Sequence, residues 1–353
     1  MIEKDLKHIA NHFPEHFWEE LRGQSIFITG GTGFFGRWIL ESFAFINQQL
    51  KLNATVTVLT RNKEAFKKTA PQLATNPSIR FHEGDIRNFT FPEQDFSHVM
   101  HLAATSALDT FNQEDPLVKF DTLVNGTRHV LDFVKNCGAK KVLFTSSGAV
   151  YGNQPSDLVH ISEDYLGAPD PLLVSSAWGE SKRASEFLCA YYAEKFNIEI
   201  KIARCFTFVG PFLPMDIHYA IGNFIADGIK GGPIKVNGDG APYRSYLYTS
   251  DLVVWLWTIL LKGKSRRAYN VGSEESISIG ELAHTVASCF SNKIAVEIAK
   301  ERDLSSPAIR YVPSTKRANS ELGLTQTVSL KEAIAKTIAY TMGNKSASEK
   351  PSP

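Results

Sequence analysis

The sequence predicts an α/β fold, in which helices cover both faces of a doubly wound parallel sheet and a smaller α/β lobe follows. Through the first 200 residues, apolar runs of strand length alternate with amphipathic segments of helix length, the pattern of repeated strand–helix–strand units. In the first unit, the apolar run Ser25–Thr29 leads directly into a glycine turn and a helical pattern through Phe45. A chain of 353 residues with 43% hydrophobic composition can bury such a core.

The charge balance argues against a polyanionic partner. Lys and Arg number 38 and Asp and Glu 37, which gives a net charge of +1. The whole chain therefore has no electrostatic attraction to nucleic acid or to a membrane surface, and any recognition of phosphate must be local. No stretch approaches the roughly 20 apolar residues that a membrane-spanning helix requires. We expect neither a nucleic-acid partner nor a membrane partner.

The cysteines indicate a reducing environment. The chain has four, Cys137, Cys189, Cys205 and Cys289, far apart and without the spacing of a zinc site or of a small disulfide framework. We expect no metal site and a cytoplasmic location.

The two ends of the chain differ in character. Residues 1–24 place Ile9, Phe13 and Trp18 at near-helical spacing, which predicts an N-terminal helical extension packed on the domain, with partner docking as the alternative. The last segment, 341–353, is rich in Ser, Lys and Pro and is expected to be a flexible tail.

The glycine turn predicts a dinucleotide site. Gly30, Gly33 and Gly36 follow the first strand and open the first helix. One glycine would allow the tight turn, one the approach of a pyrophosphate to the backbone, and one close helix packing, with the helix N-terminus facing the phosphates. A glycine triplet by itself could be an ordinary loop, but here it lies between a strand and a helix.

The end of the second strand bears on the choice of cofactor. The strand Ala54–Leu59 is followed by Thr60 and Arg61, at the place where an NAD-selective site usually carries an acidic residue. A guanidinium suits a 2′-phosphate, so NADP is favoured over NAD, with a solvated surface arginine as the alternative. Further along, Asp85 is expected near the adenine, and Ala103 would let the cofactor pass close to the chain.

These segments, together with 125–127 and 145–152, resemble the extended short-chain dehydrogenases/reductases, the NAD(P)-dependent nucleotide-sugar epimerase/dehydratase family. The resemblance runs from about Gln24 to Tyr340 and implies a Rossmann-like doubly wound parallel sheet, an NAD(P) cofactor and a nucleoside-diphosphate sugar as substrate. The expected division is an N-terminal helical extension at 1–24, an NAD(P)-binding Rossmann domain at 25–205, a substrate-binding lobe at 206–340 with 243–272 returning to the Rossmann core, and the tail at 341–353.

The catalytic motif of that family is altered here. Trp178 and Lys182 resemble its Tyr-x-x-x-Lys pair, in which the lysine lowers the pKa of a phenol that then takes a proton from the sugar. Indole donates a hydrogen bond but cannot accept that proton. The catalytic candidates are Lys182, Ser147, which would bond the reacting hydroxyl, and Trp178 at the tyrosine position. Either the redox step is weakened, or another group is the base: Ser147 relayed through water to Lys182, Tyr151 or His218.

A second departure follows the serine. Gly148 and Ala149 stand where the 4,6-dehydratases of the family carry an Asp-Glu pair and where the decarboxylases keep a glutamate in the second position. Elimination of water needs a general acid and a general base, and neither side chain can transfer a proton. The resemblance therefore favours an epimerase or a keto-sugar oxidoreductase that acts by hydride transfer at a sugar carbon.

The resemblance also assigns binding residues. The cofactor set is Gly30, Gly33, Phe34, Phe35, Gly36, Arg61, Asp85, Ile86, Leu102, Ala103, Ala104, Asn125 and Lys182. The substrate set is Ser147, Thr207, Asn223, Arg244 and Arg310, the two arginines as grips for the diphosphate. Arg302 is an alternative to Arg310 after a two-residue shift.

Family members commonly pair through two long helices, which are expected here at Pro116–Cys137 and Trp178–Phe196. We therefore expect a homodimer held by a four-helix bundle. Two alternatives to the favoured activity remain: a catalytically silent homologue that binds the cofactor or the sugar nucleotide, and an atypical NDP-sugar 4,6-dehydratase.

Overall fold

The main sheet is parallel throughout. The computed structural model describes residues 2–105, 114–215, 219–303, 305 and 307–348. Within them the main sheet has seven strands in the order β11-β6-β5-β4-β1-β2-β3, and every neighbouring pair is parallel. The strands are β1 Ser25–Thr29, β2 Thr55–Thr60, β3 Ile79–Glu83, β4 His98–His101, β5 Lys141–Ser147, β6 Glu199–Cys205 and β11 Ala268–Val271. The order reverses between β1 and β4, as in a doubly wound sheet.

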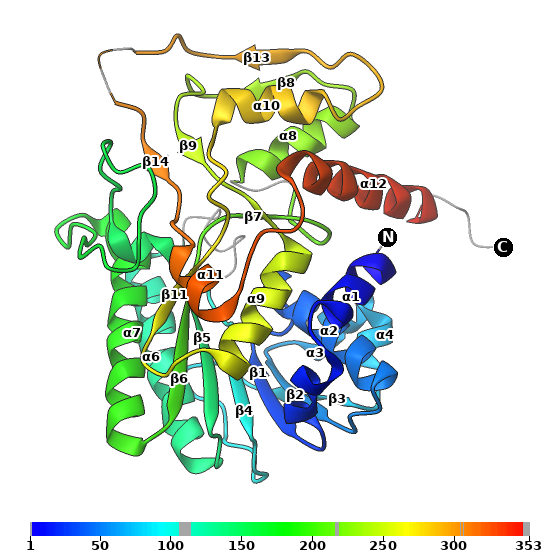
Figure 1. Cartoon of the computed structure of the whole chain (residues 1–353), viewed down its shortest axis with the longest axis vertical. Helices are drawn as coiled ribbons and strands as arrows, with labels where there is room; N and C mark the ends of the chain where they lie inside the picture. The colour runs from blue at the N-terminus through cyan, green and yellow to red at the C-terminus, as the bar shows by residue number, and fades with distance from the viewer. Residues whose placement is uncertain (1, 106–113, 216–218, 304, 306, 349–353) are drawn as a thin grey trace.

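Strand β1 shows why both faces of the sheet must be covered. Ile26 and Ile28 enter one hydrophobic core, whereas Phe27 enters a second, because successive side chains of a strand point to opposite faces. The helices that cover the faces are α2 Phe34–Gln49, α3 Lys63–Thr69, α4 Pro71–Ala74, α6 Pro116–Asn136, α7 Ala177–Phe196 and α9 Thr249–Lys262. Figure 1 shows α6 and α7 on one side of the sheet and α2 with α9 on the other. The predicted fold class is confirmed.

A smaller lobe lies beyond the carboxyl ends of the strands (Figure 1). Its elements are α8 Ala220–Ile229, β8 Ile234–Val236, α10 Ile279–Ala287, β13 Val296–Ile298 and α12 Leu330–Ser348. Two small sheets connect it to the core, β10-β7 and β12-β9-β14. Their strands are β7 Phe208–Val209, β10 Leu247–Tyr248, β9 Tyr243–Arg244, β12 Ile277–Ser278 and β14 Arg310–Tyr311. Helix α12 continues to Ser348, so the first part of the segment 341–353, expected to be a flexible tail, is helical.

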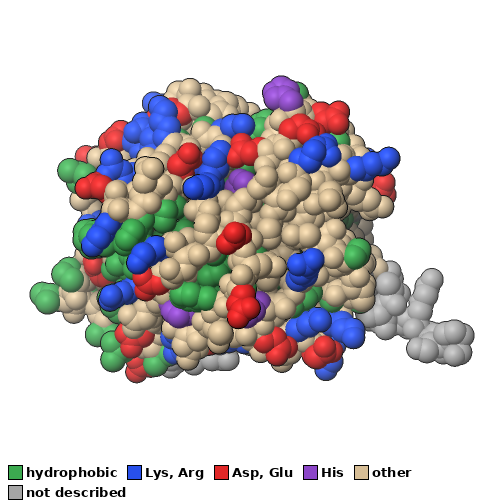
Figure 2. Space-filling model, turned by 90° about the horizontal axis from the view of Figure 1, so that it is seen from below, with side chains coloured by type: hydrophobic (Ala, Val, Ile, Leu, Met, Phe, Trp, Pro, Cys, Tyr) green, Lys and Arg blue, Asp and Glu red, His purple; other side chains and the backbone are tan. Residues whose placement is uncertain are grey.

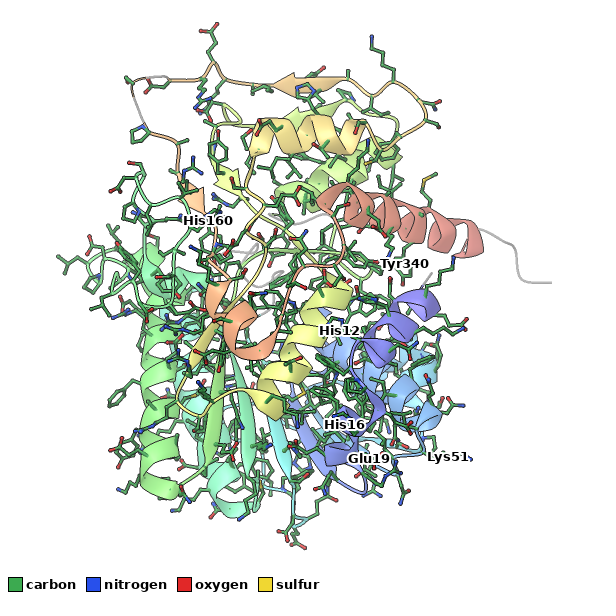
Figure 3. All side chains as sticks on the ribbon, in the orientation of Figure 1. His12, His16, Glu19, Lys51, His160 and Tyr340 are labelled. Atoms are coloured by element: carbon green, nitrogen blue, oxygen red, sulfur yellow. The ribbon has the colours of Figure 1, made fainter. Side chains whose placement is uncertain are left out.

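The N-terminal extension packs on the core. It forms α1 Ile2–Asn11 and a 3₁₀ helix at Glu15–Leu21. Trp18 is fully buried and its indole donates to the Ala10 carbonyl at 3.1 Å. The Asp5 carboxylate accepts from the Tyr248 hydroxyl at 2.8 Å and from Lys336 Nζ of α12 at 3.0 Å. This extension therefore connects the helices α2 and α9, which cover one face of the sheet, to α12 of the lobe. In Figure 3 the labelled His12 and Glu19 mark its path beside α9.

The surface carries both signs of charge. Basic and acidic side chains are interspersed over the face shown in Figure 2. Among the helices of the described ranges, none is both long and apolar enough to cross a bilayer.

Candidate active site

A large cleft lies at the carboxyl ends of the parallel strands, between the sheet and the lobe. Its volume is about 1310 Å³, more than the roughly 300–1,000 Å³ of a pocket for one drug-sized ligand. Ligands of open α/β sheets bind at this edge. The lining comes from the ends of β1, β2, β4, β5 and β6 and from lobe segments around Pro214, Arg244 and Ile279. The cleft therefore has room for a dinucleotide and a second ligand.

The glycines of the first turn have separate roles. Gly30 has φ +72°, and a Cβ there would lie 2.6 Å from the Ala103 nitrogen. A Cβ at Gly36 would lie 2.2 Å from the Gly30 carbonyl oxygen, whereas at Gly33 the nearest atom is 3.4 Å away. Gly33 is also the N-cap of α2 and lines the cleft. Gly30 and Gly36 thus permit close packing, and Gly33 leaves backbone open at a helix N-terminus, which fits a pyrophosphate.

Most of the predicted cofactor residues share this cleft. They are Gly30, Gly33, Phe34, Phe35, Arg61, Asp85, Ile86, Leu102, Ala103, Ala104 and Lys182. Gly36 lies beneath the turn, and Asn125 is exposed on α6, so neither lines the cleft. Asp85 is paired with Arg87, Nε to Oδ1 at 2.8 Å. The hydrogen bond from Arg87 lowers the pKa of Asp85, so this carboxylate is charged at neutral pH.

The three predicted catalytic residues lie together. Ser147 ends β5, and Trp178 and Lys182 lie one turn apart on α7; all three line the cleft. Lys182 Nζ donates to the Thr145 carbonyl at 2.8 Å and lies 5.5 Å from the centroid of the Trp178 ring. Burial lowers the pKa of Lys182 to about 8, since a desolvated ammonium is disfavoured. Ser147 Oγ accepts from the Ala149 amide at 3.2 Å.

Tyr151, one of the alternative bases, lies in a buried hydrogen-bond network. The Tyr151 hydroxyl donates to Asn270 Oδ1 at 2.7 Å and accepts from Arg204 at 2.9 Å. Burial raises its pKa to about 12, and Tyr151 does not line the cleft. It therefore has a structural role in a buried network. His218 lies outside the described residues.

The predicted substrate residues divide into two groups. Ser147, Thr207 and Arg244 line the cleft, whereas Asn223 on α8 and Arg310 on β14 do not. The Thr207 hydroxyl donates to the Ser245 carbonyl. Arg244 donates to the Tyr243 carbonyl at 2.8 Å, and the Arg310 guanidinium lies 4.3 Å from the Tyr243 ring centroid. Arg244 is thus the arginine of the pair that faces the cleft.

Two aromatic residues that the sequence did not single out fill the space beside Gly148. The Phe206 and Tyr311 rings are 4.7 Å apart. A Cβ at Gly148 would lie 2.7 Å from the Phe206 ring and 2.8 Å from the Tyr311 hydroxyl. A side chain at position 148 would therefore displace the Phe206 ring and the Tyr311 hydroxyl. The sequence held one signal for this arrangement, a glycine directly after Ser147.

His101, at the end of β4, is the other residue that sequence reasoning missed. Its ring nitrogens contact the Thr29 hydroxyl at 2.8 Å and the Thr127 hydroxyl at 3.0 Å. Burial lowers its pKa to about 3, so the ring is neutral at ordinary pH and joins β1, β4 and α6 beneath the cleft. Within the described ranges, no group of three or more His, Cys, Asp and Glu side chains is arranged to hold a metal ion.

The different spacing around the glycines leads to a prediction. Gly36→Ala should lower the free energy of unfolding by about 3 kcal/mol, because its methyl group meets a backbone carbonyl that cannot move away. Gly33→Ala should keep wild-type stability and weaken NAD(P) binding about 10-fold or more, because the added methyl group would hold the pyrophosphate away from the backbone amides and weaken their charge-assisted hydrogen bonds. Urea unfolding and calorimetric titration check both. Equal losses of stability would contradict the assignment.

Comparison with known proteins shows which proteins this chain resembles. UDP-glucuronic acid decarboxylase 6 of Arabidopsis thaliana is 30% identical over 310 residues, covering 88% of this chain and 86% of that protein. UDP-glucuronic acid decarboxylase 1 of Danio rerio is 27% identical and covers 96% and 77%. The crystal structure of UDP-glucuronic acid 4-epimerase from Bacillus cereus, in complex with UDP-glucuronic acid and NAD, has a TM-score of 0.76 at 23% identity, covering 91% of this chain and 99% of that one.

A dTDP-glucose 4,6-dehydratase from Streptomyces venezuelae with NAD bound has a TM-score of 0.74 at 23% identity, covering 92% and 98%. At these identities the solved structures show the shared fold. A family model matches residues 26–272, most of the chain. The glycine turn, the cleft and these similarities together show that the chain belongs to the NAD dependent epimerase/dehydratase family.

Proposed function

We propose that this protein is an NAD(P)-dependent nucleoside-diphosphate-sugar epimerase or keto-sugar oxidoreductase that acts by hydride transfer at a sugar carbon. One observation carries the proposal: a single cleft brings together the open glycine turn, the Ser147–Lys182 pair and Arg244. Each feature suits one part of the chemistry, namely a dinucleotide, a reacting hydroxyl and a diphosphate.

Each residue has a separate task in this scheme. The nicotinamide supplies the hydride acceptor or donor. Gly33, at the start of α2, would hold its pyrophosphate. Lys182 uses one of its three donors on the Thr145 carbonyl and has two left for the nicotinamide ribose. Ser147 would hydrogen-bond the sugar oxygen, and the Arg244 guanidinium can offer paired donors to a diphosphate.

The surroundings of Gly148 favour hydride transfer without elimination. Loss of water needs an acid and a base close to the sugar, and position 148 cannot carry a side chain without displacing Phe206 and Tyr311. Ala149 offers a methyl group. These residues support an epimerase or oxidoreductase over an atypical dehydratase, and over the decarboxylation for which the Arabidopsis relative is named.

Trp178 favours the second candidate, a silent homologue that binds both ligands.

Hydride exchange distinguishes the two candidates. Wild-type protein with NAD(P) is expected to exchange hydride with a member of a panel containing UDP-glucose, UDP-glucuronic acid, dTDP-glucose and their 4-keto forms. Trp178→Tyr should leave the rate near that of wild type, because another group handles the proton. Trp178→Phe, which lacks both the indole and a hydroxyl, is the control. Ligand binding without exchange, or a gain of about 100-fold in Trp178→Tyr, would favour the silent homologue.

We also propose NADP over NAD, although the solved neighbours named above contain NAD. Arg61 follows β2 and lines the cleft, without a carboxylate at positions 60–62. Arg61→Ala should weaken NADPH binding about 10- to 100-fold, the loss of a charged hydrogen bond, and should leave NADH binding almost unchanged. Lys63→Ala, which removes a cation at the start of α3 whose ammonium lies near the Phe81 ring, is the matched control. Equal losses for both cofactors would contradict this assignment.

A homodimer is the expected assembly, and exposed apolar side chains on α6 and α7 support it. Leu117 on α6 is 67% exposed and Phe187 on α7 is 69% exposed, and the two helices lie side by side at the edge of the molecule (Figure 1). The unpaired thiols of all four cysteines suit a reducing cytoplasm, the location that we propose.

Sedimentation tests the dimer. Wild-type protein should sediment as a dimer at micromolar concentration and Phe187→Glu as a monomer, because a carboxylate in the apolar interface would lack a partner. Leu166→Glu, in a loop outside both helices and 94% exposed, should remain dimeric. A monomeric wild type would contradict the prediction.

A further inference from the structure

We propose that Tyr311 supplies the proton that a tyrosine at position 178 would have handled, passing it through the Ser147 hydroxyl. The inference rests on the proposed function, since it assumes hydride transfer to a sugar carbonyl. Among the described residues, Tyr311 is the tyrosine whose hydroxyl reaches Ser147, with 3.5 Å between Oη and Oγ. The acid would therefore belong to the lobe, whereas Trp178 belongs to α7 of the core.

The space for this phenol is built into the site. Tyr311 does not line the cleft itself, but it contacts Ser147 and Phe206, which do. The absence of a side chain at Gly148 is what admits it, because a Cβ there would lie 2.8 Å from the hydroxyl. A Gly at 148, a Trp at 178 and a Tyr at 311 thus fit one arrangement, in which the phenol enters from the lobe instead of from α7.

The backbone around Tyr311 holds it in place. Tyr311 pairs with Arg244 across β14 and β9. The next residue, Val312, donates its amide to Gln154 Oε1 at 2.9 Å and accepts from the Ile161 amide at 2.9 Å. Strand β14 is therefore bonded on one side to β9 and on the other to the loop that follows β5. A fixed phenol favours proton transfer, whose rate falls with small misplacement, and catalytic hydrogen bonds that are long in the free enzyme, as this one is at 3.5 Å, commonly shorten when substrate binds.

The electrostatics make this phenol a donor. Burial raises the pKa of Tyr311 to about 12, and the Cys205 thiol group acts in the same direction, whereas the Ser147 hydrogen bond, the Arg244 charge and the Gly148 amide lower it. The hydroxyl is therefore protonated through the neutral range. A tyrosine beside the family lysine would instead have a lowered pKa and act as a base. This site is suited to give a proton, which is the requirement of keto-sugar reduction.

The proposed proton transfer accompanies hydride transfer to the sugar. The carbonyl carbon of a keto-sugar accepts hydride from the reduced nicotinamide, which is oxidised, and the carbonyl π electrons move to oxygen. That oxygen takes the proton of Ser147, whose oxygen takes the proton of Tyr311. The phenolate that remains lies near the Gly148 amide and the Arg244 guanidinium, and regains a proton from water. In the reverse direction the same groups carry the proton outward.

Tyr311→Phe tests the proposal, because it keeps the ring against Phe206 and removes only the hydroxyl. Binding of NADPH and of the nucleotide sugar, measured by calorimetry, should equal that of wild type. Single-turnover hydride transfer to the keto-sugar should fall about 100-fold or more, the usual effect of losing a general acid. Tyr243→Phe, a neighbouring tyrosine whose ring lies under Arg310, should change neither quantity.

Two further readouts separate proton donation from a structural role. The rate of Tyr311→Phe should rise with the concentration of a weakly acidic buffer such as imidazole, which can replace the missing donor, while wild type should not respond. Its rate should also fall as pH increases from 6 to 9 relative to wild type, because solvent acid becomes scarce, whereas the phenol stays protonated.

The outcomes are distinct. An active wild type with an equally active Tyr311→Phe overturns the inference and leaves the proposed function standing. A variant that loses rate without buffer rescue gives Tyr311 a packing role and also overturns it. A wild type that binds both ligands but never transfers hydride removes the proposed function, and the inference with it.

Discussion

The close approach of Gly36 to the Gly30 carbonyl is the constraint on which the rest of the site depends. Because no Cβ separates them, α2 begins directly over the end of β1 and its free amides face the cleft. The switch in strand order between β1 and β4 leaves the gap that the cofactor would enter. His101 then joins β1, β4 and α6 from below through two threonine hydroxyls. The positions of the side chains at the ends of the neighbouring strands therefore depend on this packing.

The cleft and its surroundings are formed by two parts of the chain, the core and the lobe, which contribute different side chains. The core supplies Ser147, Lys182 and Trp178 on elements anchored in the main sheet. The lobe supplies Arg244 and Tyr311, which are neighbours across β9 and β14. They meet beside Gly148, where a Cβ would lie 2.8 Å from the Tyr311 hydroxyl. Gly148 of the core and the Tyr311 phenol of the lobe are therefore neighbours, and the phenol reaches Ser147 from the lobe side, with 3.5 Å between the two hydroxyl oxygens.

Local patterns in the sequence predicted the sheet and the glycine turn, because strand alternation and glycine spacing act over a few residues. The helices α6 and α7 were expected from the family resemblance. The sequence also indicated Lys182, Ser147 and Arg244, which line one cleft. It could not show that Tyr311 meets Ser147 across 164 positions of chain, nor that Arg310 lies beside the Tyr243 ring and away from the cleft. Such contacts depend on how the lobe packs against the core, and no local sequence pattern indicates that packing.

The tryptophan at position 178 has an optical consequence. The chain has five tryptophans, and four of them, Trp18, Trp38, Trp255 and Trp257, are at most 1% exposed. Trp178 is the one that lines the cleft, with the Lys182 ammonium 5.5 Å from its ring centroid. Indole emission responds to the polarity and charge around the ring. The cleft thus carries a fluorophore in its own lining, and Trp178 is the indole of the described residues that a ligand in the cleft would contact.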